Sequence, residues 1–256
     1  MSAEQSAAAG LHPLVGGFSD AAAYDAGRPR YGGPVVTVLR DHLGLGPGSP
    51  ILELGAGTGQ LSVALLDAGL DLTAVEPLGA TRELLRAAIG PDRVREGRAE
   101  QIPLAEDSVE AVCAADAFHW FDETRAMPEI KRVLRPRGGV AILRTVPKLD
   151  HPWSAELGQM LMESRPEHPA FGERGAAAAL EEDPDFGPVT ETSVTTPAVL
   201  DRAQLLSRVA SFSWVAVLPS AEREQLLARM QAVLERHEVE RVEHDVLHQI
   251  WLARLV

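Results

Sequence analysis

Short apolar runs alternate with amphipathic segments from residue 50 to about residue 146. This alternation is typical of β-α-β units whose strands form a parallel sheet. The segments LSVALLDAGL and TRELLRAAIGP between the runs contain a closing glycine, which suits the left-handed cap of a helix. The pattern therefore predicts an α/β fold with strands at residues 51–54, 72–75, 93–95, 111–115 and 140–143.

The alternation weakens on both sides of this core. Before it, VVTVLRDHLGLGPGSP predicts a helix followed by a glycine-rich connection. After it, AEREQLLARMQAVLERH has the period of an amphipathic helix, and HPWSAELGQMLMESRPEHPAF predicts a helix with a proline-broken end. Two further strands are expected in VTETSVTT and HQIWLARLV, and Pro128 is expected to kink or divide the helix near EIKRVL.

Composition supports one folded domain. A chain of 256 residues with 45% hydrophobic and 24% charged residues can bury one substantial core. We assign residues 1–17 to a flexible N-terminus and residues 18–256 to a single domain. Within that domain we expect an N-terminal cap at 18–49, a ligand-binding core at 50–147, and a lid insertion with the C-terminal strands at 148–256.

Charge and cysteine content narrow the class of partner. A net charge of -13 would repel a nucleic-acid backbone, so we expect a small-molecule partner and no nucleic acid. The single cysteine, Cys113, lies in the apolar run VEAVCAA and is expected in the core, which suits a reducing compartment. The chain lacks a basic start followed by an apolar run, and no run approaches about 18 apolar residues. A cytoplasmic protein without a membrane span is predicted, and its oligomeric state stays open.

The stretch ILELGAGTGQ carries the strongest indication of a ligand. Gly55, Gly57 and Gly59 between a buried strand and a helix let the backbone turn sharply and approach a ligand where a Cβ would collide. Glu76, at the end of the next strand, is placed to accept hydrogen bonds from both ribose hydroxyls of a nucleoside. The alternative is that the glycines only form a tight turn. Glu53, two residues before the first glycine, disfavours a pyrophosphate and suits an amino-acid ammonium.

The motif ELGAGTG resembles the first motif of class I S-adenosylmethionine-dependent methyltransferases, and the likeness extends from about Phe18 to Leu143. The segment FSDAAAYDAGRPRYGGPVV is similar to the N-terminal segment of a branch that includes trans-aconitate methyltransferase-like small-molecule enzymes. The resemblance implies a Rossmann-like, doubly wound, seven-stranded and mostly parallel sheet with helices on both faces and a helical lid. It also implies S-adenosylmethionine as the cofactor.

The resemblance further implies which residues contact the cofactor. Tyr24, Arg28 and Tyr31 would lie near its methionine part or at the mouth of the substrate site, and the alternative is an ordinary surface turn around Pro29. A guanidinium can grip a carboxylate, and an aromatic ring attracts a sulfonium cation. In EGRAEQIPL, Ala99 would meet the adenine through its backbone. The complete set expected to bind the cofactor is Tyr24, Arg28, Tyr31, Glu53, Gly55, Ala56, Gly57, Gly59, Glu76, Pro77, Ala99, Glu100 and Asp116.

The stretch AADAFHWFD resembles the family segment that lies beneath the sulfonium and faces the substrate. Methyl transfer is an in-line displacement, so alignment in a dry pocket is its main requirement. If the acceptor must lose a proton, His119 is the candidate base; otherwise it orients the loop. Asp116 is expected to contact the substrate or cofactor near the methyl group. Trp120 and Trp214 are expected to line the substrate site, with core packing as the alternative for Trp120.

His244 and His248 raise the question of a metal site. On a helix, residues four apart face one another closely enough to share an ion. On a strand, the two residues would lie about 13 Å apart. With no clear third ligand, no metal is predicted.

These features predict an S-adenosylmethionine-dependent methyltransferase that acts on a small organic molecule, such as a small acid or a natural-product intermediate. One alternative is a protein that binds the cofactor without transferring its methyl group, as a cyclase or scaffold. A nicotinamide oxidoreductase would share the sheet and the ribose acid, but the glycine spacing and Glu53 disfavour it. The acceptor atom, whether O, N, C or S, is not indicated by the sequence.

Overall fold

The computed structural model describes residues 11–19, 21–146, 150–163, 168–169, 175 and 177–256. Within these residues the strands form one sheet in the order β3-β2-β1-β4-β5-β7-β6. The strands are β1 (Pro50–Leu54), β2 (Asp71–Val75), β3 (Val94–Arg95), β4 (Val109–Ala115), β5 (Leu134–Val146), β6 (Thr190–Asp201) and β7 (Arg241–Arg254).

The sheet is mostly parallel. β1 pairs in parallel with β2 on one side and with β4 on the other, and β7 runs antiparallel to both β5 and β6. The predicted doubly wound, seven-stranded, mostly parallel sheet is therefore confirmed for the described residues. Because the chain leaves β1 toward β2 and later returns on the opposite side to β4, a crevice opens at the carboxyl ends of β1 and β4. Ligands bind at such a switch point in open α/β sheets.

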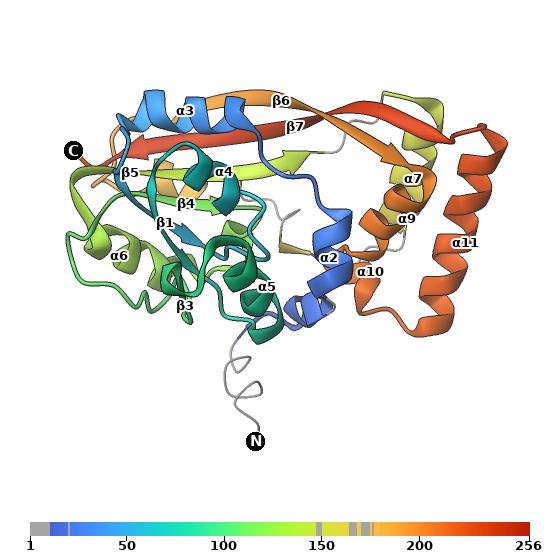
Figure 1. Cartoon of the computed structure of the whole chain (residues 1–256), viewed down its shortest axis with the longest axis horizontal. Helices are drawn as coiled ribbons and strands as arrows, with labels where there is room; N and C mark the ends of the chain where they lie inside the picture. The colour runs from blue at the N-terminus through green and yellow to red at the C-terminus, as the bar shows by residue number, and fades with distance from the viewer. Residues whose placement is uncertain (1–10, 20, 147–149, 164–167, 170–174, 176) are drawn as a thin grey trace, which may run out of the picture.

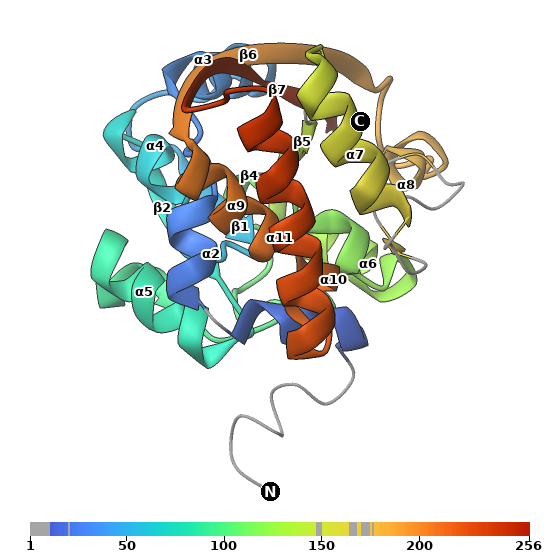
Figure 2. The same cartoon turned by 90° about the vertical axis from the view of Figure 1, so that its right-hand side faces the viewer.

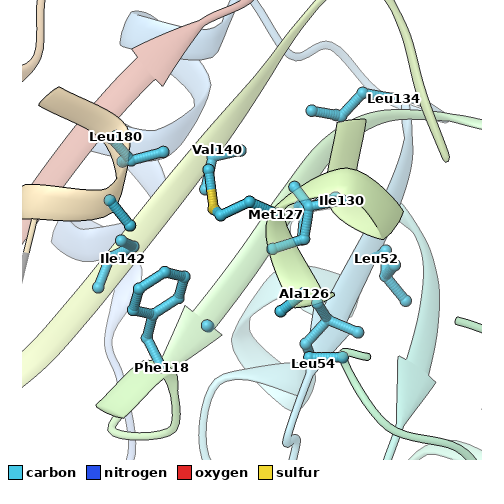
Figure 3. Packing of buried hydrophobic residues seen from close by; sticks show 14 of the residues in the cluster. Leu52, Leu54, Phe118, Ala126, Met127, Ile130, Leu134, Val140, Ile142 and Leu180 are labelled. Carbon is cyan, nitrogen blue, oxygen red and sulfur yellow. The ribbon is translucent and has the colours of Figure 1, made fainter. Parts of the chain in front are cut away.

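Helices cover both faces of the sheet (Figure 1). The core helices are α3 (Gly33–Leu43), α4 (Ser62–Asp67), α5 (Gly79–Ile89) and α6 (Glu123–Val133). Successive residues of a strand point to opposite faces. In β1, Ile51 accordingly packs in the apolar cluster completed by α3, α4 and α5, whereas Leu52 packs in the cluster completed by α6. Figure 3 shows this second cluster, with Met127 of α6 reaching toward Val140 of β5.

α6 runs through Pro128 as one helix, so the expected division of this segment is not observed. The side chain of Asp122 accepts a hydrogen bond from the backbone N–H of Thr124 and caps the first turn. Met127 and Ile130 are buried on the sheet side of the helix. Capping and burial together offset the backbone hydrogen bond that proline cannot donate.

A further group of helices forms a cap at one end of the sheet (Figures 1 and 2). Its members are α7 (Pro152–Glu163), α9 (Arg202–Ala210), α10 (Ser213–Ala216) and α11 (Ser220–Arg236). Leu157, Val215 and Met230 belong to the separate apolar cluster that these helices share. β6 and β7 are longer than the predicted strands, and their far ends, at residues 196–201 and 241–246, pair only with each other. This two-stranded extension carries the sheet into the cap.

The N-terminal segment packs on the same cap. It contains the 3-10 helix η1 (Pro13–Ser19), which contacts α10, and α2 (Ala21–Gly27), which contacts α9. Val15 is buried, so the structure differs over residues 13–17 from the flexible terminus expected there, whereas residues 1–10 lie outside the described residues. The remaining short elements are η2 (Pro91–Arg93), η3 (Phe118–Trp120) and α8 (Ala178–Glu181). Within the part of the chain that the structure describes, no helix is long and apolar enough to cross a membrane.

Candidate active site

The loop after β1 has a left-handed backbone at each of its glycines. The φ angles of Gly55, Gly57 and Gly59 are 65°, 58° and 100°, a region that L side chains rarely adopt. A Cβ on Gly55 would lie 2.7 Å from the Cβ of Ala117, so the loop can approach β4 only without a side chain. A Cβ on Gly59 would lie 3.1 Å from Leu85 of α5, which gives that glycine a packing role. These glycines fix the path of the backbone beside the crevice.

Glu76 lies directly after β2, with its carboxylate turned back toward this loop. One oxygen accepts a hydrogen bond from the N–H of Gly57 at 2.9 Å. The other accepts from the N–H of Leu78 and the hydroxyl of Thr81, both at 2.9 Å. A carboxylate has about four acceptor positions, so three are filled and a ribose that used both its hydroxyls here would share or replace one of them. Burial raises the pKa of Glu76, and these hydrogen bonds oppose that shift.

Two adjoining hollows lie at the carboxyl ends of the strands. The first hollow reaches from the N-terminal segment to the turn after β3, and the second lies beneath α2. Tyr24, Gly55, Ala115 and Asp116 line both, so the two hollows meet at these residues. Of the predicted cofactor residues, those in the first hollow are Tyr24, Gly55, Gly57, Glu76, Pro77, Ala99, Glu100 and Asp116. Those in the second are Tyr24, Arg28, Tyr31, Glu53, Gly55, Ala56 and Asp116. Gly59 lines neither.

The far end of the first hollow is formed by the turn after β3. Ala99 is buried there, and the Glu100 carboxylate accepts a hydrogen bond from the N–H of Asp122 at 2.9 Å. This contact ties the turn to the start of α6. Glu100 therefore has a structural partner within the chain as well as a place on the wall of the hollow.

Glu53 occupies the floor of the second hollow. Its side chain is 2% exposed, and the hydroxyl of Ser62 donates to its carboxylate at 2.5 Å. Burial raises the pKa of Glu53 to about 8, because one hydrogen bond compensates little of the lost hydration. Glu53 is consequently protonated at neutral pH in this state of the protein. A cation brought into the hollow would favour its ionised form.

Tyr24 and Arg28 of the N-terminal segment close the second hollow from above. The Arg28 guanidinium lies 5.0 Å from the centre of the Tyr24 ring and 5.1 Å from that of Phe212, a cation-π arrangement on both sides. Its Nε is buried and has no hydrogen-bond partner among the described residues. A buried donor without a partner is costly, so Arg28 is suited to an acceptor on a ligand.

Asp116 stands where the two hollows meet. It has a φ of 50°, a left-handed conformation that aspartate adopts more readily than most residues. Its carboxylate accepts hydrogen bonds from the N–H of Thr145 at 2.8 Å and from the hydroxyl of Tyr31 at 3.0 Å. The carboxylate is thereby fixed in one orientation beside both spaces.

His119 and Trp214, both predicted to face the substrate, line neither hollow. Trp120 lines the first hollow, and its ring lies 4.8 Å from that of His119 and 4.9 Å from that of His168. The Trp214 ring lies 5.1 Å from the His168 ring and stacks on Phe212 at 4.9 Å. Burial lowers the pKa of His119 to about 3, so its imidazole is neutral and weakly basic here. The geometry supports an orienting role for His119 more than a role as base.

Several lining residues have no counterpart among the predicted ones. Leu11, Val15 and Phe18 line the first hollow from the N-terminal segment, and Thr145 lines the second from β5. Asp25 holds α2 in place, because its carboxylate accepts hydrogen bonds from Thr58 Oγ1 at 2.8 Å and Gln60 Nε2 at 3.0 Å. We call these hydrogen bonds the latch of α2. Its residues stand in two sequence motifs, AAAYDAGRP and the TGQ end of the glycine motif, but the spacing of the motifs does not predict that they contact each other.

His244 and His248 both lie on β7. Of the two alternatives considered for this pair, the strand is therefore the one observed, and four residues along a strand span about 13 Å. His248 is fully buried and hydrogen-bonded to threonines on its two neighbouring strands.

Comparison with known proteins gives consistent results. The family described as a methyltransferase domain matches residues 52–142. An uncharacterized methyltransferase from Mycobacterium tuberculosis is 35% identical over 215 residues, which cover 84% of this chain and 84% of that protein. An uncharacterized methyltransferase-like protein from Schizosaccharomyces pombe is 30% identical over 216 residues, with the same coverage of 84% on each side. A solved structure of a proposed type II methyltransferase from Anaeromyxobacter dehalogenans has the same fold, with a TM-score of 0.65 at 24% identity and coverage of 89% of this chain and 97% of that one.

Proposed function

Because the chain belongs to the class I S-adenosylmethionine-dependent methyltransferases, we propose that it methylates a small organic molecule bound beneath the cap. S-adenosylmethionine is its cofactor. The observation that carries the proposal is the meeting of the two hollows at Tyr24, Gly55 and Asp116, under a segment that is packed on the cap helices. A junction covered by this segment suits a small acceptor.

The residues of both hollows fit this cofactor. The first hollow has a buried carboxylate, Glu76, for the ribose and the backbone around Ala99 for the adenine. The second has Glu53 for the ammonium and the unpartnered Nε of Arg28 for the carboxylate of the methionine part. A Cβ on Gly57 would lie in van der Waals contact with the Tyr24 ring at 3.6 Å, and the positive φ of Gly57 keeps this place for glycine. The two ends of the ligand would then be bound in different hollows, with its middle at Asp116.

The bound cofactor supplies a methyl group activated by a sulfonium. The chain's own contribution is to align the acceptor and to exclude water, because the displacement requires no covalent intermediate on the protein. Tyr24 lines both hollows, and its aromatic ring would attract a sulfonium cation bound where they meet. Asp116 offers a fixed carboxylate at the same place. Leu11, Val15 and Phe18 keep the wall of the first hollow apolar.

Charge beneath the cap favours a small acid as the acceptor. Arg28 and Arg144 lie near enough to His119 to help lower its pKa, and Arg28 lies near enough to Arg208 to lower the pKa of that buried guanidinium, after burial itself. Arg28, Arg144 and Arg208 thus lie in one region of the interior, beside the negative charge of Asp116, in a chain whose net charge is -13. With Arg28 assigned to the carboxylate of the cofactor, Arg144 and Arg208 would stabilise a carboxylate on the acceptor. The likeness of the N-terminal segment to trans-aconitate methyltransferase-like enzymes points the same way. Nucleic acid would meet an acidic protein surface and is not proposed.

Transfer of a labelled methyl group tests the proposal. The protein is incubated with methyl-labelled S-adenosylmethionine and panels of small carboxylic acids, phenols and amines, while S-adenosylhomocysteine is measured in parallel. Label in the acid panel, with an equal amount of S-adenosylhomocysteine, is the expected result. Label only in phenols or amines would refute a small acid as the acceptor but would still support methylation of a small molecule. Tight cofactor binding without S-adenosylhomocysteine in any panel would support the non-transferring scaffold, which the family relationship does not favour.

A further inference from the structure

A buried chain of polar side chains runs from Asp116 through the sheet to β6. The Tyr31 hydroxyl, bonded to Asp116, lies 3.2 Å from Thr145 Oγ1. Thr145 Oγ1 lies 3.4 Å from Nδ1 of His248, and Nε2 of His248 lies 2.9 Å from Thr196 Oγ1. His248 and Thr196 are 0% and 5% exposed, so these contacts are shielded from solvent.

The hydrogen bond between Tyr31 and Asp116 determines the direction of every other hydrogen bond in this row of polar side chains. A carboxylate only accepts, so Tyr31 gives its one hydroxyl hydrogen to Asp116. Thr145 must then donate to Tyr31, and its own oxygen is left to accept from Nδ1–H of His248. A neutral imidazole with Nδ1–H has a bare Nε2, which accepts from the Thr196 hydroxyl. Burial lowers the pKa of His248, which keeps the imidazole neutral.

We infer that His248 is a positioning residue for Asp116, acting through Thr145 and Tyr31, while Thr196 donates to its Nε2. The inference rests on the proposed function, because Asp116 is there taken to face the cofactor and the acceptor. Each of these side chains has one hydrogen to donate. The tautomer of His248 therefore decides whether Thr145 can donate to Tyr31. With the opposite tautomer, Thr145 would have to donate to Nδ1, and the Tyr31 hydroxyl would lose its donor.

Packing of the Tyr31 and His248 rings supports the arrangement. The Tyr31 and His248 rings lie 4.6 Å apart at an angle of 38°. The same β5 residue, Thr145, also donates its backbone N–H to Asp116, so one strand supplies both the side-chain link and the main-chain link. Asp116 has a left-handed backbone, which local hydrogen bonds stabilise in aspartate. The orientation of this carboxylate therefore depends on residues of β5, β7 and β6, which are successive neighbours in the sheet beyond β4.

The first test measures the tautomer of His248 in the wild-type protein. Histidine labelled with ¹⁵N distinguishes a protonated from a bare ring nitrogen by its chemical shift, and the His248 signals are identified by their loss in His248→Asn. The proposal predicts a proton on Nδ1 and none on Nε2 at pH 7. A proton on Nε2, alone or together with Nδ1, would overturn it. The measurement requires neither cofactor nor acceptor.

The second test compares two amide substitutions. Asparagine places a donor near the position of Nδ1, whereas glutamine reaches toward that of Nε2. If His248 acts through Thr145, His248→Asn should bind S-adenosylmethionine within about twofold of wild type, and His248→Gln should bind about threefold to tenfold more weakly, as expected for one orienting hydrogen bond. If His248 only fills space, the larger glutamine should be tolerated better, and this reversed order would refute the proposal. Melting temperatures of both variants separate affinity from stability.

The third test uses two variants: Thr196→Val, and Thr195→Val at the exposed neighbouring position as its control. The first should weaken S-adenosylmethionine binding by about threefold or more, and the second should leave it unchanged. Equal affinities in both would count against the role of Thr196. Failure of the wild-type protein to bind S-adenosylmethionine at all would instead refute the proposed function, and the tautomer measurement would still decide the hydrogen-bond chain.

Discussion

Replacing Glu53 with glutamine should abolish a proton release that accompanies cofactor binding. Burial raises the pKa of Glu53 to about 8, so the free protein holds a proton on this side chain at pH 6.5. An α-ammonium, with a pKa near 7.7 to 8.0, is already charged at that pH. When the ammonium enters the second hollow, the ionised form of Glu53 becomes the favoured one, and its proton leaves to the buffer.

The size of the release can be worked out. A unit charge about 4 Å away at an effective dielectric constant of about 20 stabilises the carboxylate by about 4 kcal/mol. At about 1.4 kcal/mol per pKa unit, this lowers the pKa of Glu53 from about 8 to about 5. At pH 6.5 the side chain is then about 97% protonated before binding and about 97% ionised afterwards, so close to one proton is released.

Calorimetric titration with S-adenosylmethionine in buffers of different ionisation enthalpy measures the number of protons directly. We expect about one proton for wild type, close to zero for Glu53→Gln, and the wild-type value for the control Glu191→Gln, whose residue is exposed on β6. Glutamine keeps an acceptor for the Ser62 hydroxyl, so the fold of the loop should survive. A release of one proton that persists in Glu53→Gln would refute the assignment of the ammonium to this hollow.

Four other outcomes follow. Without ligand, the free energy of unfolding in urea of wild type minus that of Glu53→Gln should fall by about 1.4 kcal/mol per pH unit as the pH rises from 4.5 to about 8, because folded Glu53 retains a proton that the unfolded chain releases. Taking the difference cancels the opposite slope of His119, whose lowered pKa makes the unfolded chain the stronger proton binder below about pH 6.5. Gly55→Ala should weaken S-adenosylmethionine binding by at least about tenfold through strain and overlap, whereas Gly48→Ala, with a φ of 77° and nothing within 4 Å, should cost only about 1 to 2 kcal/mol of stability. His119→Asn should reduce turnover by less than about threefold if the residue orients its loop; a loss of about 100-fold or more would restore it as the base. Asp25→Ala should raise the Kd of S-adenosylmethionine by about threefold to tenfold, since α2 loses its hydrogen bonds to the glycine loop; an unchanged Kd in calorimetry would contradict a latch.

The central part of the fold was predictable from the sequence because local patterns of apolar residues and glycines specify it. The strands around Ile51, Leu72 and Val140 are apolar runs with buried neighbours on both faces, and Gly90 caps the end of α5. The ends of β6 and β7 could not be read in this way. Their added residues pair with each other in the cap, and the partner of a strand is not encoded in its own period.

The structure of the N-terminal segment also depends on distant contacts that its own sequence does not indicate. PLVGGFS has no helical or strand period, yet it packs on α10. A Cβ on Gly17 would lie 2.4 Å from the carbonyl oxygen of Ser213, so a distant contact explains this glycine. Among site residues, those carried by short motifs, such as Glu53 and Glu76, were predictable. Thr145 and Phe18 were not, because only the folded sheet and cap bring them to the hollows.

Glu53 and Glu76 differ in how the chain compensates their burial, and the difference bears on how the ligand lies. Both carboxyls are almost fully buried, and desolvation raises the pKa of each. Glu76 receives hydrogen bonds from two backbone N–H groups and from Thr81, so its carboxylate is supported within the chain and suits neutral hydroxyls. Glu53 receives one from Ser62, and no cation among the described residues contributes to its pKa, so its ionised form would be favoured by a cationic ligand. A ligand with hydroxyls at one end and an ammonium at the other meets both conditions in only one orientation. In the proposed function, that orientation would bring its middle to Asp116, where the first and second hollows join.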